Sequence, residues 1–292
     1  MGWEAQKKGI DRDQIEESLR AMGLGPGDKV VFHSSLKSMG YVEGGPDAVI
    51  DAFLDVVGAA GGSEGPARPS GTVMVPTFSY SFVGNSRAVA FDPVTAPSFT
   101  GLITEVFRKK RGAVRSLHPT HSVAAIGRDA EELVRGHETV AALGAGSPFH
   151  RLAEAGGYVA LIGCGNTRNS LIHVIESIAR VPYIDIFCWQ HLGWREAARV
   201  IGADGREHEV PLFEVPGCSE SFDRLTPHLV RAGVMIEGRI GEARAYLLKA
   251  REVIRIGVEI LGRDPFYLLC PAGTCQACDH RRDGVNRRDN RR

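Results

Sequence analysis

The chain has 292 residues, of which 43% are hydrophobic, and it carries 35 basic and 35 acidic side chains. This length and apolar content can supply the core of a large folded domain, so we expect a folded protein and not a disordered chain. Because the charge is balanced, the bulk composition attracts neither nucleic acid nor a membrane surface, and we expect neither as a partner. No stretch approaches the roughly 20 apolar residues that cross a membrane, and the N-terminal segment contains no apolar core of signal-peptide length.

Six cysteines are distributed unevenly, and three of them are bunched near the end of the chain. They are Cys164, Cys188, Cys218, Cys270, Cys275 and Cys278. Such spacing is typical of thiols in a reducing compartment rather than of an extracellular disulfide framework. We therefore expect a cytoplasmic protein.

Helical and strand-like patterns alternate along the chain. Through the first 180 residues they predict helix 11–23, a turn followed by a strand within 25–36, helix 46–58, strand 72–80, helix 98–110, strand 121–127, helix 129–137, strand 158–165 and a helix around His173. Further on we expect strands over 183–189 and near 208–215, and helices over 221–233 and 243–262. Residues 59–71, rich in Gly, Pro, Ser and Ala, predict a flexible surface loop.

This alternation predicts an α/β fold, with a single domain built on a mixed central sheet that helices flank. Ligands of such folds bind beyond the carboxyl ends of the strands. Nothing before residue 265 is polar enough to mark a boundary, so we expect one domain over 1–265 and a Cys-rich, Arg-rich tail over 266–292. A homodimer is one assembly that the sequence allows.

The segment 31–49 carries a strand through a polar loop to the start of a helix. Free amides at a helix N-terminus favour an anion, and hydroxyls and an ammonium group stand just ahead of it. The loop is neither a Walker loop nor a G-x-G-x-x-G motif, so the pattern leaves an ordinary strand-to-helix turn open beside an anion site. The residues of such an anion site would be Ser34, Ser35, Lys37, Gly40 and Val42.

Residues 115–125 carry two histidines on either side of Pro119, His118 and His121, followed by Ser122. Proline pushes the residue before it into an extended conformation, so this segment enters a strand with polar side chains. A strand would place the two histidines on opposite faces, which argues against a shared metal ion. Structural and substrate-shaping roles are both left open.

His173 lies in a helix that follows a glycine loop after the strand 158–165. At 100° per residue it shares one sector with Asn169, Glu176 and Arg180, which is also how a solvent-exposed face looks. The position after a strand end places the histidine near the ligand crevice instead. An imidazole is also the side chain best suited to accept a proton near neutral pH. The pattern leaves the exposed face and the catalytic base as alternatives.

The C-terminal segment combines thiols with arginines. Cys270, Cys275, Cys278 and His280 offer four candidate zinc ligands, although the spacing is compressed and there is no second C-x-x-C pair. Unligated thiols are the alternative. Six arginines among the last twelve residues predict a solvated, disordered tail.

Six motifs appear in an order that resembles the aminoglycoside 3-N-acetyltransferase family, over roughly residues 10–262. They are "HSSLKSMGYVEGGPDAVIDAFLDVVG", "GTVMVPTFSYSF", "FDPVTAPSFTGLITEVFR", "RSLHPTHSVAAIG", "LGAGSPFHRL" and "LIGCGNTRNSLIHVIE". The resemblance implies a single α/β domain that transfers acetyl from acetyl-CoA to an amine, usually the 3-amino group of a deoxystreptamine ring.

The resemblance also implies roles for individual residues. His173 matches the family's histidine and would be the general base of a direct transfer, while Glu176 matches the acidic residue of the same motif. The "HSSL" motif would contribute Ser34 and Ser35 to the coenzyme A site. The "HPTHS" motif would contribute His118, Thr120 and Ser122 to it. The anion of the first site would then be a coenzyme A phosphate.

Departures from the family pattern leave the amine open. Residues 211–225 differ from the version typical of resistance enzymes, and Glu214 and Glu220 are further candidates for the acidic partner of His173. A polycationic aminoglycoside needs an acidic pocket, and the candidate carboxylates are Asp92, Glu105, Asp185, Glu214, Glu220 and Asp223. The alternatives are acetylation of a biosynthetic amino-sugar or amino-nucleotide, a non-catalytic acyl-CoA-binding protein, and an acetyl-cysteine route through Cys164.

Overall fold

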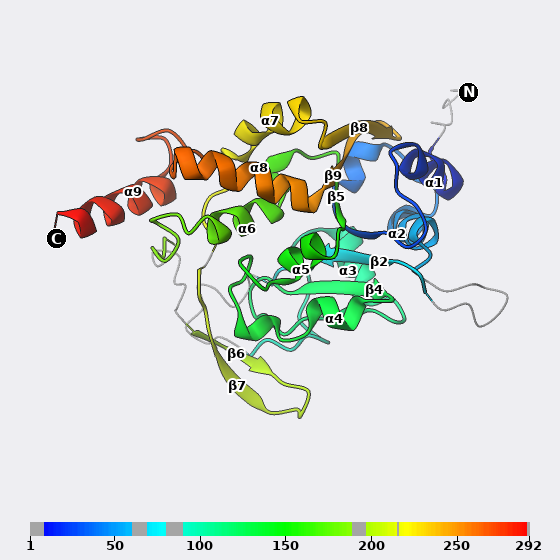
Figure 1. Cartoon of the computed structure of the whole chain (residues 1–292). Helices are drawn as coiled ribbons and strands as arrows, with labels where there is room; N and C mark the ends of the chain where they lie inside the picture. Colours follow the sequence, from blue (N-terminus) through cyan, green and yellow to red (C-terminus); the bar gives the residue numbers. More distant parts are fainter. Residues whose placement is uncertain (1–8, 60–68, 80–89, 189–196, 215, 291–292) are drawn as a thin grey trace, which may run out of the picture.

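A computed structural model describes residues 9–59, 69–79, 90–188, 197–214 and 216–290 (Figure 1). A seven-stranded sheet forms the centre, in the order β3-β4-β2-β1-β5-β9-β8. Its strands are β1 (Lys29–Ser34), β2 (Thr72–Pro76), β3 (Val114–Arg115), β4 (Val123–Gly127), β5 (Tyr158–Ile162), β8 (Met235–Ile240) and β9 (Ala243–Lys249). The strands β6 (Ala197–Ile201) and β7 (Glu207–Pro211) form a separate two-stranded sheet. The expectation of one α/β domain with a mixed sheet is confirmed.

Parallel pairing at the middle of the sheet decides where a ligand can bind. β1 pairs in parallel with β2 on one side and with β5 on the other, whereas the outer pairs are antiparallel. The carboxyl ends of β1, β2 and β5 therefore reach the same edge of the sheet. That edge is where crevices form in α/β folds.

Helices cover both faces of the sheet, because alternate strand residues point to opposite sides. Val30 and Phe32 join the core beneath α1 (Arg12–Ala21), α2 (Gly45–Val57) and α3 (Leu102–Phe107). Val31 joins the core on the other face. The helices with residues in that second core are α4 (Ala130–Val134), α5 (Pro148–Glu154), α6 (Leu171–Ile178), α7 (Thr226–Arg231), α8 (Ala250–Arg263) and α9 (Gln276–Asp289).

Two predicted elements after residue 180 are wrong. Residues 243–249 form strand β9 instead of the start of a helix, and only 250–263 are helical. The strand pairs with β5 and with β8, which the sequence did not predict. Good helix formers fill this stretch, and the gain from completing the sheet overrides their local preference. Residues 183–188, expected as a strand, form turns and irregular backbone instead.

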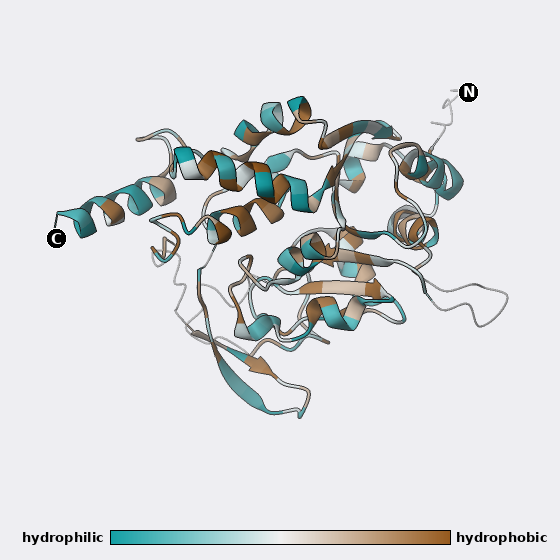
Figure 2. Cartoon of the chain, viewed as in Figure 1, coloured by the Kyte–Doolittle hydropathy of each residue, from teal (hydrophilic) through white to brown (hydrophobic). Residues whose placement is uncertain are grey.

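The C-terminal segment is ordered as well. Gln276–Asp289 form helix α9, so the expectation of a disordered tail is wrong for this stretch. Figure 2 shows that α9 is largely hydrophilic, yet Arg281 and Val285 are buried. A Cβ at Gly284 would meet the side chain of Ile186, and Arg288 pairs with Asp185 at 2.7 Å. The helix therefore packs on residues 185–186 of the domain.

Within the described ranges, no helix is both long and apolar enough to cross a membrane. The predicted loop at 59–71 falls largely on residues 60–68, which lie outside the described residues.

Candidate active site

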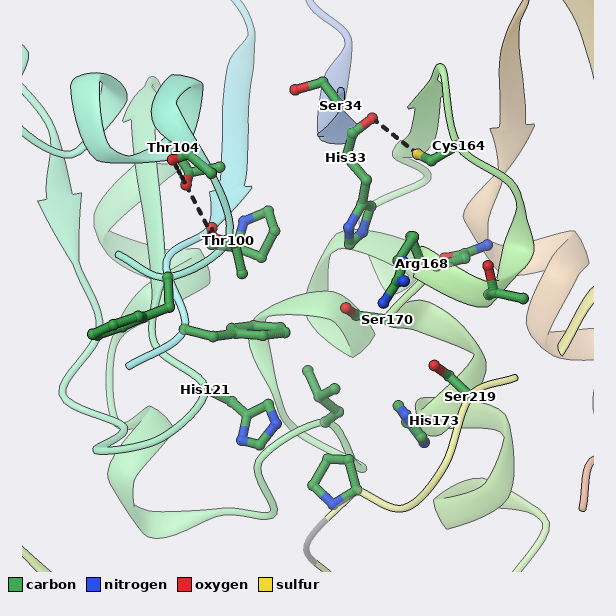
Figure 3. Close-up of a pocket in the computed structure, with 18 of the residues that line it drawn as sticks. His33, Ser34, Thr100, Thr104, His121, Cys164, Arg168, Ser170, His173 and Ser219 are labelled. Carbon is green, nitrogen blue, oxygen red and sulfur yellow. Dashed lines mark hydrogen bonds between the residues drawn. The ribbon is translucent and has the colours of Figure 1, made fainter. Parts of the chain in front are cut away.

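A cavity of about 1000 Å³ opens at the carboxyl ends of the three parallel strands (Figure 3). The strand ends supply His33, Ser34, Pro76, Phe78, Gly163 and Cys164. Parts of segments 99–104, 167–173 and 216–219 complete the walls. This size is at the upper end for small-molecule pockets and suits a large ligand or two ligands together.

His173 lines this cavity from helix α6, close to Ser219 on the facing segment (Figure 3). Its Nδ1 lies 2.7 Å from Oε2 of Glu176, one helical turn further on. Because an ionised carboxylate can only accept, Nδ1 carries a proton, and in the neutral ring Nε2 then holds the lone pair. The ring of Phe222 packs edge-on against the imidazole at 4.7 Å and fixes its plane. The exposed-face interpretation is wrong, because only 8% of His173 and 1% of Glu176 are exposed.

Glu176 is held from its other side too. Its Oε1 accepts a hydrogen bond from the Tyr183 hydroxyl at 3.0 Å and lies 3.9 Å from Nη1 of Arg281. Burial alone would raise the pKa of Glu176, but the hydrogen bond from His173, the charges of His173 and Arg281, and the Tyr183 hydroxyl together hold it below its ordinary value. Burial and the neighbouring carboxylate raise the pKa of Tyr183, so its hydroxyl stays a donor.

The other two candidate acids lie elsewhere. Glu214 accepts a hydrogen bond from the Ser177 hydroxyl at 2.5 Å, and Ser177 in turn accepts one from the amide of Ala145. Glu220 is exposed. Among the three candidate partners, only Glu176 forms a hydrogen bond with His173 in the described part of the chain. The short i, i+3 spacing on one helix brings this pair together.

None of the six carboxylates named for an acidic pocket lines the cavity within the described residues. Asp92 accepts hydrogen bonds from its own turn, and Glu105 pairs with Arg108 at 2.7 Å. Asp185 pairs with Arg288, and Asp223 accepts from the amide of Asn166. Glu214 accepts a hydrogen bond from Ser177, and Glu220 is exposed. The expected acidic pocket is therefore not formed by these six residues.

Two buried polar atoms at the end of β1 have no hydrogen-bond partner among the described residues. They are Nε2 of His33 and the hydroxyl oxygen of Ser34, and both residues line the cavity. The His33 ring stacks on Phe149 at 6.0 Å, and burial lowers its pKa to about 4. A buried polar atom without a partner is costly, so these two atoms are prepared to bind a ligand.

The remaining residues of the first anion site are spread over different environments. Ser35 lines the cavity and accepts a hydrogen bond from Ser38 at 2.8 Å. Lys37 is exposed, and it does not line the cavity. Gly40 has φ 81°, which glycine tolerates, and Val42 is buried in the core and bridges to Ile10. Of these residues, Ser34 and Ser35 meet at the cavity.

The second histidine motif forms a turn instead of a strand entry. The amide of His121 donates to Nδ1 of His118 at 3.1 Å, and the rings lie 6.0 Å apart, so the expectation of opposite strand faces is wrong. His118, Thr120 and Ser122 are buried and do not line the cavity. His121 does line it, with its Nδ1 2.8 Å from the Thr120 hydroxyl.

Acidification should destabilise the protein through its buried histidines. Burial lowers the pKa of His33 to about 4 and that of His137 to about 3. Burial also holds the pKa values of His118 and His121 well below their ordinary value. All four stay neutral when folded but protonate at about pH 6.5 when unfolded, so stability is full above that pH and is lost as the pH falls toward the folded pKa values. Each contributes a slope of about 1.4 kcal/mol per pH unit.

Urea unfolding at several pH values between about 7.5 and about 5 measures this slope. His137 bonds to the Ser116 hydroxyl and to the carbonyl oxygen of Ala142, so His137→Gln lowers stability but also flattens the pH dependence. His208→Gln, on the exposed β6–β7 hairpin, is the control and leaves the slope unchanged. An equal slope in wild type and His137→Gln would contradict the assignment.

Cys164 lines the cavity as a protonated thiol. Its Sγ lies 3.6 Å from the carbonyl oxygen of His33, which accepts its hydrogen bond (Figure 3). Burial raises its pKa to about 11. A thiol with a raised pKa is a poor nucleophile at neutral pH.

A cluster of four cysteines lies behind the wall of the cavity. The sulfur atoms of Cys218, Cys270, Cys275 and Cys278 all lie within 4.8 Å of one another. His280 is exposed and is not a member, so the predicted set of ligands is wrong in one place: Cys218 takes the position given to His280. The hydrogen bond from Cys278 lowers the pKa of Cys218 to about 5.

Several residues of the site were not predicted. His33 directly precedes the serines of its motif, and its position at a strand end was an available signal. Cys218 stands 52 residues before Cys270, too far for a spacing rule. Tyr183 and Arg281 reach Glu176 from segments whose proximity is set by tertiary packing, so no local pattern marks them.

Comparisons with known proteins identify relatives of most of the chain. A family model described as Aminoglycoside 3-N-acetyltransferase matches residues 31–262. Aminoglycoside N(3)-acetyltransferase VII of Streptomyces paromomycinus is 33% identical over 282 residues, covering 87% of this chain and 94% of that protein. A mutant of aminoglycoside acetyltransferase AAC(3)-IVa in complex with a gentamicin is similar at a TM-score of 0.80 and 28% identity, covering 96% of this chain and 99% of that one.

A second solved structure, the binary complex of AAC-IIIb with CoASH, has a TM-score of 0.74 at 26% identity and covers 88% of this chain and 97% of that one. These matches extend over most of the chain, at the level of both sequence and fold. The chain therefore belongs to the aminoglycoside 3-N-acetyltransferase family.

Proposed function

We propose that the protein transfers the acetyl group of acetyl-CoA to the 3-amino group of aminoglycosides. The observation that carries this proposal is the buried His173–Glu176 pair facing a large cavity at the carboxyl ends of β1, β2 and β5. Relatives support both substrates: one similar structure holds CoASH and another holds a gentamicin.

His173 acts as the general base in a direct transfer. The neutral amine attacks the carbonyl carbon of the thioester, and Nε2 of His173 accepts the proton that the nitrogen loses. The carbon–sulfur bond then breaks, and the leaving thiolate takes the proton back from Nε2 of His173, so that the coenzyme departs as a thiol and the imidazole is neutral again. Glu176 accepts the hydrogen bond from Nδ1 and stabilises the imidazolium that forms.

The end of β1 supplies the groups for the coenzyme. His33 Nε2 and the Ser34 hydroxyl are buried atoms without partners at the cavity, and Ser35 lies beside them. A smaller hollow of about 360 Å³ shares Gly163 and Cys164 with the main cavity. Because the two hollows adjoin at these residues, we expect an elongated coenzyme to extend from one into the other past the end of β5.

Cys164→Ser should retain acetyl transfer. The buried thiol has a raised pKa and donates to the carbonyl oxygen of His33, a contact that a serine hydroxyl can also make. We expect kcat within about threefold of wild type, because no acetyl-cysteine forms. A steady-state assay with intact-mass analysis of the enzyme after quenching checks this. If Cys164→Ser lost its activity and the quenched wild-type enzyme carried an acetyl group, the covalent route through an acetyl-cysteine would be established instead.

One observation favours a second candidate, acetylation of a less cationic amine such as an amino-sugar or amino-nucleotide. The described cavity lining contains an arginine, Arg168, and no carboxylate. A polycationic drug gains most from carboxylates that face its ammonium groups. A non-catalytic acyl-CoA-binding protein is the third outcome that an experiment can distinguish.

A thiol-release assay with acetyl-CoA separates these functions. Purified protein is offered a panel of 2-deoxystreptamine aminoglycosides and a panel of amino-sugars and amino-nucleotides. Release of coenzyme A with the deoxystreptamine panel supports the proposal. Release of coenzyme A with the second panel alone would show that the substrate is another amine. Tight binding of acetyl-CoA without release of coenzyme A on any amine would show a non-catalytic acyl-CoA-binding protein.

The cysteine cluster is proposed as a structural zinc site. Cys218 and Cys270 have sulfur atoms 3.7 Å apart, and all six cysteines of the chain are free thiols. A tetrahedral zinc with Zn–S bonds of roughly 2.3 Å places its sulfur ligands about 3.8 Å apart, so the four side chains fit the ion. Cys218, Cys270, Cys275 and Cys278 would hold it, and a closed four-thiolate set is structural rather than catalytic.

Metal analysis tests the zinc site independently of activity. We expect about one zinc per chain in wild type, about one in His280→Gln, and a large loss in Cys278→Ser, because only the latter removes a ligand. Inductively coupled plasma mass spectrometry of the purified proteins measures this. Metal-free wild-type protein after growth in zinc-supplemented medium, or loss of zinc in His280→Gln, would contradict the assignment.

A further inference from the structure

Arg281 is a buried cation that has no role in the acetyl transfer proposed above. It lies on helix α9, and only 1% of its surface is exposed. Its Nη1 is 3.9 Å from Oε1 of Glu176, and its Nε donates to the carbonyl oxygen of Ile186 at 3.4 Å. Because burying a guanidinium is expensive, its place beside an equally buried carboxylate calls for an explanation.

The two carboxylate oxygens of Glu176 have different partners. Oε2 accepts the hydrogen bond from His173, whereas Oε1 faces the Tyr183 hydroxyl and Arg281. The guanidinium carbon of Arg281 lies 5.3 Å above the Tyr183 ring, so the cation also supports the tyrosine that orients the carboxylate. Arg281 thus contacts the carboxylate on the side away from the reacting histidine.

Arg281 is held by the same structure that forms the wall of the cavity. It follows Cys278 of the cysteine cluster by three residues on α9. Gly217, which lines the cavity, passes so close that a Cβ there would overlap the guanidinium group. The neighbour of Gly217 is Cys218, the cluster member from the opposite segment. The cluster therefore fixes both the helix that carries Arg281 and the wall that covers it.

A buried carboxylate needs a counter-charge to stay ionised while its histidine is neutral. The titratable groups facing Glu176 in the described structure are His173 on its own helix, Tyr183 and Cys188 on the following segment, and Arg281 on α9. Of these, Arg281 is the permanent cation. The neutral Tyr183 hydroxyl can orient the carboxylate but cannot balance its charge.

We propose that Arg281 is a positioning residue for acetyl transfer, which keeps Glu176 ionised and oriented toward His173 and which the cysteine cluster holds in place. This inference rests on the proposed function, because it assigns Arg281 a role through the pair that deprotonates the amine. Among the described residues, Arg281 is not one of those that line the cavity, so its effect on the amine and the thioester is indirect.

A double-mutant cycle with pH profiles tests the role. We expect Arg281→Gln to lower kcat about 10- to 100-fold, the range for a misplaced reacting group, while KM for acetyl-CoA and the zinc content stay unchanged. The acidic limb of the kcat/KM profile moves to higher pH, because Glu176 takes up a proton more easily without the cation. Arg281→Lys, which keeps the charge, recovers part of kcat. Arg287→Gln, an exposed arginine on the same helix, is the control and matches wild type.

The cycle separates a role through Glu176 from a merely structural one. In the Glu176→Gln background, Arg281→Gln should change kcat by less than about threefold, because the group it acts through is already gone. Should Arg281→Gln fail to fold, Tyr183→Phe keeps the ring but removes the donor to Oε1, and it should lower kcat with the same pH shift.

Two results overturn the inference: equal kcat losses from Arg281→Gln in both backgrounds, or a pH profile identical to that of Arg287→Gln. For Tyr183→Phe, an unchanged kcat and pH profile has the same meaning. Failure of the proposed function is recognised differently, by full turnover of His173→Ala or by the absence of acetyl transfer in wild type.

Discussion

Replacing His173 with alanine is expected to slow acetyl transfer by roughly 100- to 10,000-fold, the usual worth of a positioned general base. The imidazole lines the cavity with its Nδ1 bonded to Glu176, and its Nε2 is the proposed proton acceptor that the variant lacks. Steady-state thiol release with acetyl-CoA and a 2-deoxystreptamine aminoglycoside measures kcat/KM in both proteins.

Binding of the coenzyme serves as the control for this variant. His33 and Ser34, the proposed coenzyme contacts, lie on β1 and are not altered by a change on α6. We therefore expect the dissociation constant of acetyl-CoA to stay within about twofold, measured by calorimetry. Turnover by His173→Ala at the wild-type rate would rule out the base.

Glu176→Gln should reduce kcat by roughly 100- to 10,000-fold, although the side chain keeps its shape. A neutral amide cannot stabilise the imidazolium that forms on His173, and its amide hydrogens can favour the wrong tautomer of the ring. The variant should also lose stability, by up to about 3 kcal/mol, because Arg281 stays buried without its counter-charge. Thiol release gives the rate, and urea unfolding gives the free energy of unfolding.

Ser177→Ala is the matched control on the same helix, since it disrupts the contact to Glu214 and leaves the His173 pair intact. If Ser177→Ala lost as much activity as Glu176→Gln, Glu214 would become the supporting acid. Unchanged kinetics in Glu176→Gln would remove the carboxylate from the mechanism.

Much of the fold followed from local patterns. The helices at 12–21 and 45–57 and the strands β1, β2, β4 and β5 occur where apolar spacing, glycine and proline predicted them. Strand β9 was missed because residues 243–249 consist of good helix formers that run into a true helix. Its alternation of buried and exposed residues becomes decisive only when β5 and β8 are present to pair with it.

The candidate active site, like the fold, could be predicted from the sequence only in part. The proximity of His173 and Glu176 follows from helical spacing, so the sequence could name both residues. What the helix alone could not show is that His173 and Glu176 face inward. Phe222 packs on His173, and Tyr183 and Arg281 lie against Glu176. The fourth thiol of the cluster and the cation beside Glu176 come from distant segments, and no spacing rule connects them.

The proposed reaction moves an acetyl group from acetyl-CoA to the 3-amino group of an aminoglycoside. The chemical structure of the acetylated product is its most direct test. Wild-type protein is incubated with acetyl-CoA and a single purified gentamicin, and the product is analysed by mass spectrometry and two-dimensional NMR. We expect a single acetyl group, located on the 3-amino nitrogen, with one coenzyme A released for each product formed. Acetylation of a different nitrogen, or no product from protein that binds acetyl-CoA, would contradict it.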